Sequence, residues 1–308
     1  MGTVVCGIAG YLQKEPSAPG AAESLLAMVR SLYRRGPDSC GVALYGPPVE
    51  DGFVVRGWYA ADDDAAAAAL EALKERWTVR HDDRTAGYLR VEVATDATAC
   101  EVADVLDRCG VDVFSVGRSL EIVKHEFAAD ELGRTYGLNG FAARHGTGHT
   151  RMATESRVDV AHAHPFWARP FEDVAVVHNG QLTNYYKLRR LFEMRGYRFR
   201  TGNDTELIAL YIADRLARGD PLNEAVTASM RDLDGSFTYL ISTAEGFGVA
   251  RDPFASKPGV IYEDERAVAV ASEEHAIEAA LGETSGATRE VQAGEVLTWT
   301  LGERKAAA

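Results

Sequence analysis

The chain has 308 residues, 46% of them hydrophobic and 26% charged, which is typical of a folded globular protein with a sizeable core. Acidic residues outnumber basic residues by 46 to 33, giving a formal net charge of -13 at pH 7, and such a surface repels phosphate backbones. No apolar run approaches the roughly 18 to 20 residues that span a bilayer, and the first residues lack the pattern of a signal peptide. We therefore expect a cytoplasmic protein with neither a nucleic-acid partner nor a membrane contact.

The first part of the chain predicts a strand, a helix and a second strand. Residues 4–12 are mostly small or β-branched and apolar, which favours a strand. Residues 21–33 place apolar side chains at helical spacing and predict a helix. The turn-like segment RRGPDS then leads into the apolar segment CGVALYG at 40–46, which predicts the second strand.

Residues 47–139 differ in character from the sequence on either side. An acidic, alanine-rich segment and the segment TACEVADVLDRC each predict a helix, while GYLRVEVA, VDVFSV and LEIVKH predict strands. Because strands and helices alternate within so short a span, we expect a compact α/β insertion packed beside the main domain. It carries no motif of recognisable chemistry.

From Gly146 onward, short strands and loops surround one clear helix. Asn203 or Asp204 is placed to cap that helix, whose apolar face follows directly. Four closely spaced apolar segments come next and predict a meander of strands. These segments are 235–243, 246–252, 258–264 and 266–272.

The four cysteines form no CxxC pair and no cluster with zinc spacing, so we expect Cys40, Cys100 and Cys109 to be buried thiols. Cys6 is different because GIAG follows it, and small residues let backbone and substrate approach the sulfur closely. If residues 1–5 are removed, the freed α-amine, with an ordinary pKa near 8, lies close enough to take the thiol proton. On these residues alone, a buried cysteine in a strand is an equally good interpretation.

The segment HNG at 178–180 ends the apolar run VAVV, which we expect to place it at the end of a strand. There the side-chain amide of Asn179 and the backbone N–H of Gly180 would offer two neutral donors to a developing oxyanion. The alternative from these residues alone is an Asn-Gly hairpin turn.

Arg151 and Asp204 are a cation and an anion in small or apolar surroundings. Together they would suit the carboxylate and the ammonium of an amino acid, with Arg151 offering a bidentate fork. Each residue alone would equally suit a structural ion pair or a helix cap.

Three histidines, at 162, 164 and 178, raise the question of a metal site. No third ligand with carboxylate or cysteine spacing accompanies the HAH segment, so we expect pocket-lining or turn histidines and no metal.

Five motifs, taken together and in order, resemble those of the class II glutamine amidotransferases, a branch of the N-terminal-nucleophile hydrolases. They are CGIAG, RGPDS.G, GHTR.AT, HNG and DTE, spread over residues 6–206. The resemblance implies an α+β fold, the four-layer αββα sandwich of the N-terminal-nucleophile hydrolases with a small α/β insertion. It also implies a propeptide at 1–5, an amidotransferase domain at 6–300 that includes the insertion at 47–139, and a tail at 301–308.

The resemblance assigns catalytic roles to three residues. Cys6 would be the nucleophile that attacks the side-chain amide of L-glutamine, with its own α-amine as the base. Asn179 and the N–H of Gly180 would form the oxyanion hole. No cofactor is implied.

The resemblance also assigns the substrate contacts. Arg151 would hold the glutamine α-carboxylate, Asp204 would hold the α-amine, and backbone near Thr154 would complete the pocket. Arg35 and Gly36, in the RRGPDS loop, resemble the segment that closes over bound glutamine.

The segment TRMATES and the later segment HPF look more like those of the glutamate-synthase-type amidotransferases, especially the free-standing subunits of N-methylglutamate synthase. Many class II members carry other residues at the positions of Met152 and Glu155. The sequence holds no phosphate-binding glycine loop and no dinucleotide fingerprint to use the ammonia. A partner subunit is therefore implied, by resemblance a flavin-containing glutamate-synthase-like protein or a glutamine-synthetase-like ligase.

Two other functions stay open on the sequence. A different N-terminal-cysteine amide hydrolase would leave Arg151 and Asp204 unpaired and desolvated, which is costly. A catalytically silent glutamine-sensing or scaffold subunit would instead keep residues 1–5 in the mature protein.

Overall fold

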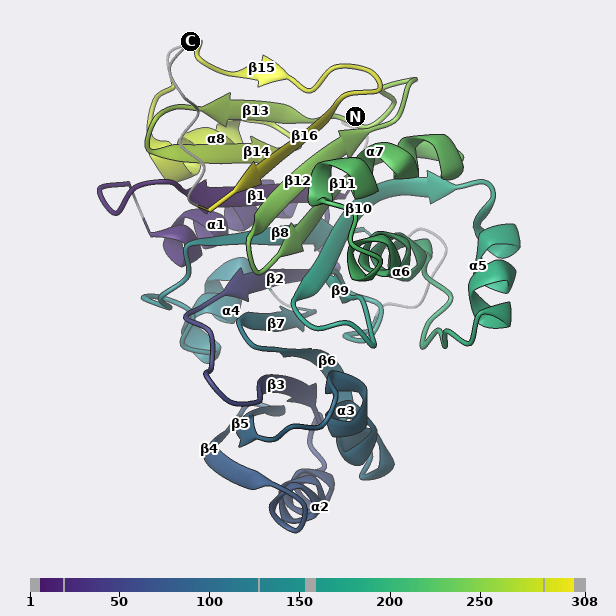
Figure 1. The fold of residues 1–308 in the computed structure, drawn as a ribbon. Helices are drawn as coiled ribbons and strands as arrows, with labels where there is room; N and C mark the ends of the chain where they lie inside the picture. The colour runs from purple at the N-terminus through teal and green to yellow at the C-terminus, as the bar shows by residue number, and fades with distance from the viewer. Residues whose placement is uncertain (1–5, 19, 127, 153–158, 285, 302–308) are drawn as a thin grey trace.

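The structure is a computed structural model that describes residues 6–18, 20–126, 128–152, 159–284 and 286–301. Two antiparallel sheets form its centre (Figure 1). The larger sheet has seven strands in the order β15-β13-β14-β1-β8-β2-β7. Its strands are β1 (Gly7–Gln13), β2 (Ser39–Tyr45), β7 (Leu120–His125), β8 (His145–Arg151), β13 (Val260–Glu263), β14 (Ala267–Ala271) and β15 (Arg289–Glu290).

The second sheet has five strands in the order β16-β12-β11-β10-β9. Its long central strands run antiparallel with a register that pairs Asn179 with Thr238 and Gly180 with Phe237. The strands are β9 (Phe166–Trp167), β10 (Val174–Leu182), β11 (Gly235–Thr243), β12 (Gly246–Arg251) and β16 (Val296–Thr300).

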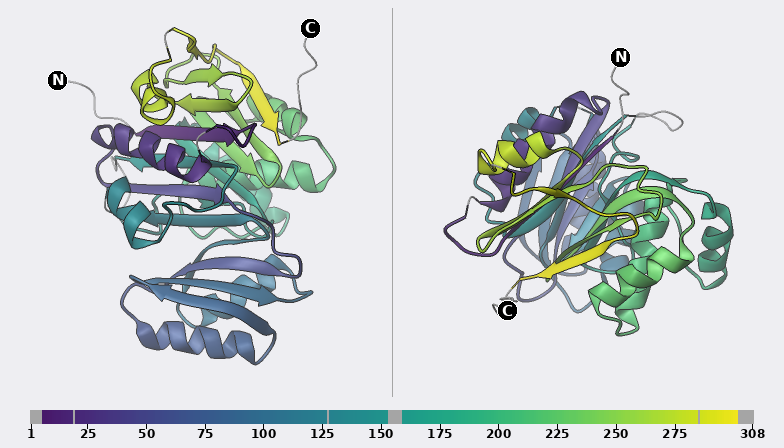
Figure 2. Two further views of the ribbon diagram at one scale, coloured as in Figure 1. Left: turned by 90° about the vertical axis from the view of Figure 1, so that its left-hand side faces the viewer. Right: turned by 90° about the horizontal axis from the view of Figure 1, so that it is seen from above.

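Helices cover the outer faces of both sheets, so that the layers run helix, sheet, sheet, helix (Figure 2). On the seven-stranded sheet lie α1 (Ala21–Ser31), the short 3-10 helix η1 (Leu32–Arg34), α4 (Ala129–Thr135) and α8 (Glu274–Leu281). On the side of the five-stranded sheet lie α5 (Tyr185–Met194), α6 (Asp204–Ala217) and α7 (Leu222–Asp232). The expected αββα sandwich is confirmed.

The alternation of side chains along each strand explains why the sheets pack face to face. Ile8 and Leu12 of β1 enter the apolar layer between the sheets, whereas Ala9 and Tyr11 face the helices. Because both faces are covered, β1, β2 and β14 are largely apolar along their length, whereas β8 is equally buried but has the polar, glycine-rich sequence HGTGHTR. The layer between the sheets comprises Ile8, Leu12, Val177, Leu240, Phe247, Val249, Ile261, Val268, Val270, Val291 and Trp299.

A third sheet, with the strand order β4-β5-β3-β6, forms a separate module below the sandwich in Figure 1. It consists of β3 (Phe53–Trp58), β4 (Thr78–Thr85), β5 (Tyr88–Ala94), β6 (Asp112–Gly117), α2 (Asp63–Lys74) and α3 (Ala99–Arg108). The expected insertion at 47–139 also includes β7 and α4. In the structure β7 is an edge strand of the seven-stranded sheet, and α4 packs against this sheet and against α1.

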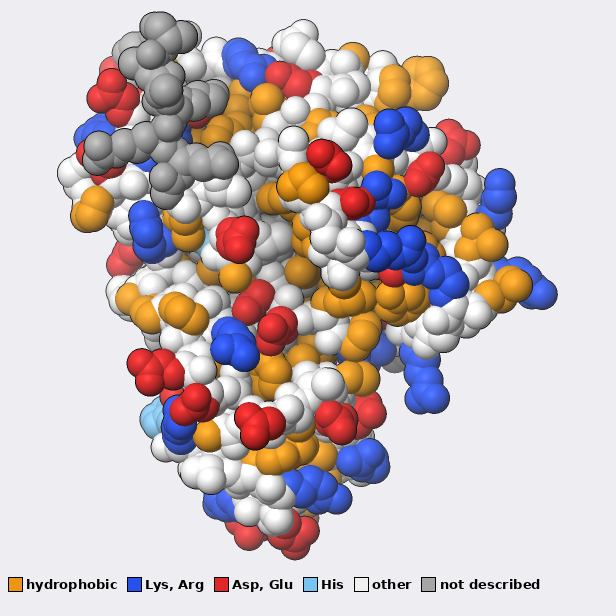
Figure 3. Space-filling model, in the orientation of Figure 1, with side chains coloured by type: hydrophobic (Ala, Val, Ile, Leu, Met, Phe, Trp, Pro, Cys, Tyr) orange, Lys and Arg blue, Asp and Glu red, His pale blue; other side chains and the backbone are white. Residues whose placement is uncertain are grey.

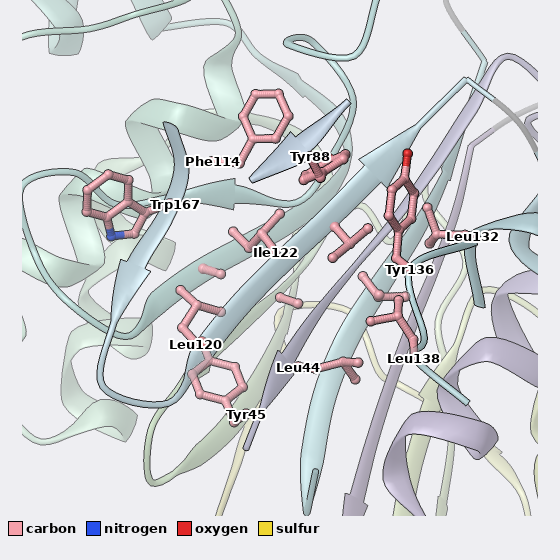
Figure 4. Close-up of a cluster of buried hydrophobic side chains, with 14 of the residues drawn as sticks. Leu44, Tyr45, Tyr88, Phe114, Leu120, Ile122, Leu132, Tyr136, Leu138 and Trp167 are labelled. Atoms are coloured by element: carbon pink, nitrogen blue, oxygen red, sulfur yellow. The ribbon is translucent and has the colours of Figure 1, made fainter. Parts of the chain in front are cut away.

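The module shares an apolar core with the sandwich. Tyr88 and Phe114 of the module lie in the same cluster as Ile122 of β7, and Tyr136, which follows α4, packs its ring against Tyr88 with centroids 4.8 Å apart (Figure 4). Aromatic pairs at this separation add to the stabilisation that burial provides.

Two local predictions are wrong. The expected meander is split, because β11 and β12 belong to the five-stranded sheet whereas β13 and β14 belong to the seven-stranded sheet. HNG does not end a strand or form a hairpin turn, because β10 continues through it to Leu182 and pairs with β11 throughout.

The surface shows no segregation of charge on the face drawn in Figure 3, where acidic and basic side chains are interspersed. Within the described part of the chain, no helix combines the length and apolar character needed to cross a bilayer.

Candidate functional site

The structure places Cys6 directly before β1, beside the end of β8. The pairing of Gly7 with Thr150 sets this contact, because it brings the residue before β1 next to the residues after Thr150. The N–H of Met152 lies 3.3 Å from Cys6 Sγ, and the thiol lies 3.5 Å from the Met152 carbonyl oxygen. Burial raises the pKa of the Cys6 thiol above its ordinary value, although the Met152 backbone and the charge of Arg151 act in the opposite direction.

Asn179 reaches Cys6 from the other sheet. Its Nδ2 donates to the Cys6 carbonyl oxygen at 2.9 Å and to Ser272 Oγ at 3.2 Å. Ser272 follows β14, and its hydroxyl also accepts from the Ile8 N–H at 2.9 Å. The two sheets are thus joined at Cys6 by a side-chain amide that is 2% exposed.

Gly180 occupies a position that requires glycine. Its φ is +136°, and a Cβ built there would lie 2.0 Å from the carbonyl oxygen of Ser236 on β11. This close pairing lets the strand continue past Asn179 with the backbone of Gly180 next to the Asn179 side chain.

The loop with Arg35 and Gly36 lies against the same end of β8. Arg35 Nε donates to the Cys6 carbonyl oxygen at 3.2 Å, and its guanidinium forms an ion pair with Glu273. At Gly36, an added Cβ would lie 2.5 Å from the carbonyl carbon of Arg151, so the loop touches the β8 backbone.

Arg151 is the last residue of β8 and is 4% exposed. Burial lowers the pKa of its guanidinium, although Cys6, Asp159 and Asp38 favour the charged form. A guanidinium in this position can bind a carboxylate in a bidentate manner.

Asp204 begins α6 and contacts the end of β10. Its Oδ2 accepts from the Leu182 N–H at 2.9 Å, and its Oδ1 lies 3.4 Å from His178 Nδ1. Burial raises the pKa of Asp204, but His178 and the N–H groups of Leu182 and Thr205 outweigh it, so the pKa lies below its ordinary value. The helix itself is capped by Asn203, whose side chain accepts from the Thr205 N–H.

Comparisons with known proteins show the family of the chain. A family model described as a glutamine amidotransferase domain matches residues 149–279. The chain is 34% identical over 280 residues to a putative glutamine amidotransferase of Methanothermobacter thermautotrophicus, with 88% of this chain and 92% of the relative covered. It is 37% identical over 276 residues to the glutamine amidotransferase-like protein GlxB of Rhizobium meliloti, with 89% and 91% covered. The chain belongs to the class II glutamine amidotransferase family.

Solved structures agree with the fold of this class II glutamine amidotransferase. The glutamine phosphoribosylpyrophosphate amidotransferase from B. subtilis superposes with a TM-score of 0.61 at 21% identity, covering 96% of this chain and 47% of that one. An allosteric regulatory enzyme of purine biosynthesis superposes with a TM-score of 0.62 at 22% identity and the same coverage. The chain therefore spans about half the length of these two proteins, and the likeness concerns the fold alone.

The amidotransferase site contains contacts that the sequence did not predict. The Nε2 of His149 lies 3.1 Å from Asn179 Oδ1. In the segment between β14 and α8, Ser272 contacts Asn179 and Glu273 contacts Arg35. The sequence could have indicated His149, because this residue belongs to the motif GHTR. Nothing in the sequence indicates Ser272, because its contact depends on the antiparallel pairing of β14 with β1.

Three sequence predictions fall wholly or mostly on residues that the structure does not describe, among them the tail at 301–308, of which residues 302–308 lie outside the described part. Thr154, expected to complete the pocket, lies outside the described residues, and so do residues 1–5 with the peptide bond between Val5 and Cys6. Among the residues that the structure does describe, no group of three or more His, Cys, Asp or Glu is placed to hold a metal ion.

Proposed function

We propose that this amidotransferase hydrolyses the side-chain amide of L-glutamine through a thioester on Cys6. The observation that carries the proposal is the meeting of three distant segments at one atom. The Cys6 carbonyl oxygen accepts from Asn179 Nδ2 at 2.9 Å and from Arg35 Nε at 3.2 Å. These contacts support the proposal, because Cys6, Asn179 and Arg35 are the residues to which it gives the roles of nucleophile, amide donor and closing loop.

Activation of the nucleophile is the first step. Because burial raises the pKa of the Cys6 thiol, the thiol is mostly protonated at neutral pH and needs a base. Removal of residues 1–5 would free the α-amine of Cys6, whose ordinary pKa of about 8 suits that task. The proton would pass from Sγ to this amine directly or through a water molecule.

Attack on the amide forms the bond between Sγ and the side-chain carbonyl carbon and moves negative charge onto the oxygen. The Nδ2 of Asn179 and the N–H of Gly180 are proposed to donate to that oxygen. The tetrahedral intermediate then breaks its carbon–nitrogen bond, and the leaving nitrogen takes the proton from the α-amine and departs as ammonia. Water hydrolyses the remaining thioester to glutamate and the free thiol.

Substrate binding uses the two ends of the amino acid. Arg151 is proposed to hold the α-carboxylate, and Asp204 is proposed to hold the α-ammonium. Arg151 is buried and the side chain of Asp204 is 20% exposed, and their opposite charges match the two charged groups of a zwitterionic amino acid. Backbone near Thr154 would complete the pocket, and the loop with Arg35 and Gly36 would close over it.

Delivery of ammonia to a partner subunit completes the proposal. The described residues form the amidotransferase sandwich and the four-stranded module, and the sequence carries no nucleotide-binding motif that would support a second reaction. We propose a synthase of the glutamate synthase or N-methylglutamate synthase type as the acceptor, on the sequence features TRMATES and HPF.

The test combines intact-mass analysis with a glutaminase assay on three proteins: wild type, Cys6→Ala and Cys109→Ala. Wild type should lack residues 1–5 and release glutamate and ammonia, whereas Cys6→Ala should keep these residues and release neither. Cys109→Ala is the matched control, because this thiol lies after α3 in the four-stranded module and should leave both readouts unchanged. Wild type that keeps its first five residues and releases no ammonia would contradict the mechanism.

A further inference from the structure

The side-chain amide of Asn179 is held from both ends. On one end, Nδ2 faces the Cys6 carbonyl oxygen at 2.9 Å and Ser272 Oγ at 3.2 Å. On the other end, Oδ1 faces His149 Nε2 at 3.1 Å. His149 lies on β8 of the seven-stranded sheet and Asn179 on β10 of the five-stranded sheet, so this contact also crosses the interface between the sheets.

The hydrogen-bond chemistry fixes which group donates. A backbone carbonyl oxygen accepts only, so the end of Asn179 that faces Cys6 must be the NH₂ group. The other end is then the oxygen, which leaves His149 Nε2 as the donor. The same Nε2 lies 3.2 Å from the His178 carbonyl oxygen, a second acceptor that also requires a proton on Nε2.

The surroundings of His149 keep the ring in this state. The ring is 1% exposed and packs against the ring of His164, with centroids 4.2 Å apart and planes tilted by 38°. Among the described residues its Nδ1 has no hydrogen-bond partner. Burial lowers the pKa of His149 to about 3, so the imidazole is neutral at physiological pH.

We propose that His149 is a positioning residue that orients the Asn179 amide, so that its NH₂ group faces the reacting carbonyl. This inference rests on the proposed function. If the amide turned over, Oδ1 would point at the Cys6 carbonyl and at the oxyanion, and an attractive donor would become a repulsive acceptor. Donors that are oriented before the reaction cost no reorganisation during it.

The chain contains a matched control for this residue. His145 lies four residues earlier on β8 and is also 1% exposed. Its Nε2 contacts the Thr243 carbonyl oxygen at 2.7 Å, and its ring stacks on Tyr45 with centroids 4.4 Å apart. His145 therefore lies on the same strand as His149, is equally buried and makes the same type of hydrogen bond. Its partner Thr243, however, lies at the opposite end of β11 from Thr238 and Phe237, which pair with Asn179 and Gly180.

The experiment compares glutaminase kinetics of His149→Leu and His145→Leu in the full chain, with melting temperatures measured beside them. We expect both variants to lose thermal stability. Only His149→Leu should lower kcat, by about 10- to 100-fold with KM nearly unchanged, because removing an oxyanion donor outright costs about 100- to 1,000-fold. Equal kcat in the two variants would overturn the inference. Wild type without glutaminase activity would overturn the proposed function and this inference with it.

Conservative variants keep the test decisive if His149→Leu does not fold. A glutamine side chain places an amide N–H near the position of Nε2, whereas an asparagine places it near Nδ1. His149→Gln should therefore recover most of the wild-type kcat and His149→Asn should not. The reverse order, or equal rates, would contradict orientation through Nε2.

A double-mutant cycle separates positioning from general structural damage. In an Asn179→Ala background, His149→Leu should cause no further loss of kcat, because the group that it orients is absent. Losses that multiply across the two substitutions would show that His149 acts independently of Asn179 and would overturn the inference.

Discussion

The residues that support the proposed oxyanion hole are constrained by backbone geometry as much as by side-chain chemistry. Asn179 supplies a side-chain amide, and the conformation of Gly180 determines the path of the backbone next to Asn179. Gly180 has a φ of +136°, and a Cβ added there would lie 2.0 Å from the carbonyl oxygen of Ser236. The position therefore has no space for any side chain. The sequence pair Asn-Gly is therefore used inside a strand and not in a turn.

Gly180→Ala should destabilise the protein by about 2–5 kcal/mol, since a positive φ costs about 1–2 kcal/mol and overpacking adds about 1–3 kcal/mol. Gly196→Ala is the control, because Gly196 has a φ of +91° but no atom within 4 Å of an added Cβ. It should cost about 1–2 kcal/mol, from conformation alone. Urea denaturation of both variants measures the difference, and equal losses would contradict the steric argument.

Asp204 predicts a pH dependence of stability. Its pKa in the folded state lies below its ordinary value, because His178 and two backbone N–H groups outweigh the effect of burial. A depressed pKa stabilises the folded state above the unfolded pKa, about 3.9 for Asp, and this contribution is lost as the pH falls through the folded value. The difference in unfolding free energy between wild type and Asp204→Asn should therefore shrink below about pH 4. Denaturant titrations from neutral to acid pH would show it, and a difference that grows on acidification would be contrary to this account.

At the scale of helices and strands, sequence periodicity predicted part of the main domain, but the expectation of one helix after Gly146 missed α5, α7 and α8. β1 and β2 gave clear apolar runs and α1 and α6 gave helical spacing, whereas the buried strand β8 has the sequence HGTGHTR and gave no such run. The edge strand β4 was missed because it is largely exposed and carries the charged segment RHDDR, which has no apolar alternation. The end of β10 was misplaced because its pairing with β11, and not its composition, extends it through Gly180.

Prediction of the candidate site is limited in the same way, because strand pairing cannot be predicted from the composition of one segment. Cys6, Asn179, Arg35 and Gly36 could be named from the sequence, and the structure brings them together. Their contacts through His149 and Ser272 depend on the register between strands that are distant in the chain. Register is set by side-chain packing between elements, which no single segment encodes.

Strand β7 is joined to the four-stranded module by a buried ion cluster. Glu121 of β7 accepts from Arg56 Nε of β3 at 2.6 Å and from Arg90 Nη2 of β5 at 2.8 Å. Burial raises the pKa of Glu121, but the two guanidinium groups outweigh it and the pKa lies below its ordinary value. Glu121→Gln should cost about 3–5 kcal/mol, because it leaves buried positive charge uncompensated.

Equilibrium unfolding in urea tests this prediction, with Glu71→Gln as the control. Glu71 contacts Lys74 on the exposed face of α2, where both side chains are largely accessible to water. That substitution should leave the unfolding free energy nearly unchanged. Similar effects of the two substitutions would show that the buried cluster does not stabilise the junction.

For the whole molecule, the continuous core implies that the module and the sandwich unfold together. Val55 and Leu89 of the module, Ile122 of β7 and Leu25 of α1 belong to one connected apolar cluster. Separate unfolding of the module would expose the apolar residues that it shares with β7, at a cost of roughly 25 cal/mol per Å² of apolar surface. We therefore expect the module not to unfold independently of the sandwich.

The fluorescence of the four tryptophans can follow the unfolding of each region separately, because Trp58 and Trp77 lie in the module whereas Trp167 and Trp299 lie in the sandwich. Replacing either pair with phenylalanine leaves fluorescence that reports on the other region. Urea transitions of the two double variants, each compared with its own far-UV circular dichroism, should coincide, because apolar contacts across β7 are lost by both regions at once. A module signal that changes at lower urea than the circular dichroism of the same variant would show that the shared core does not couple the two regions.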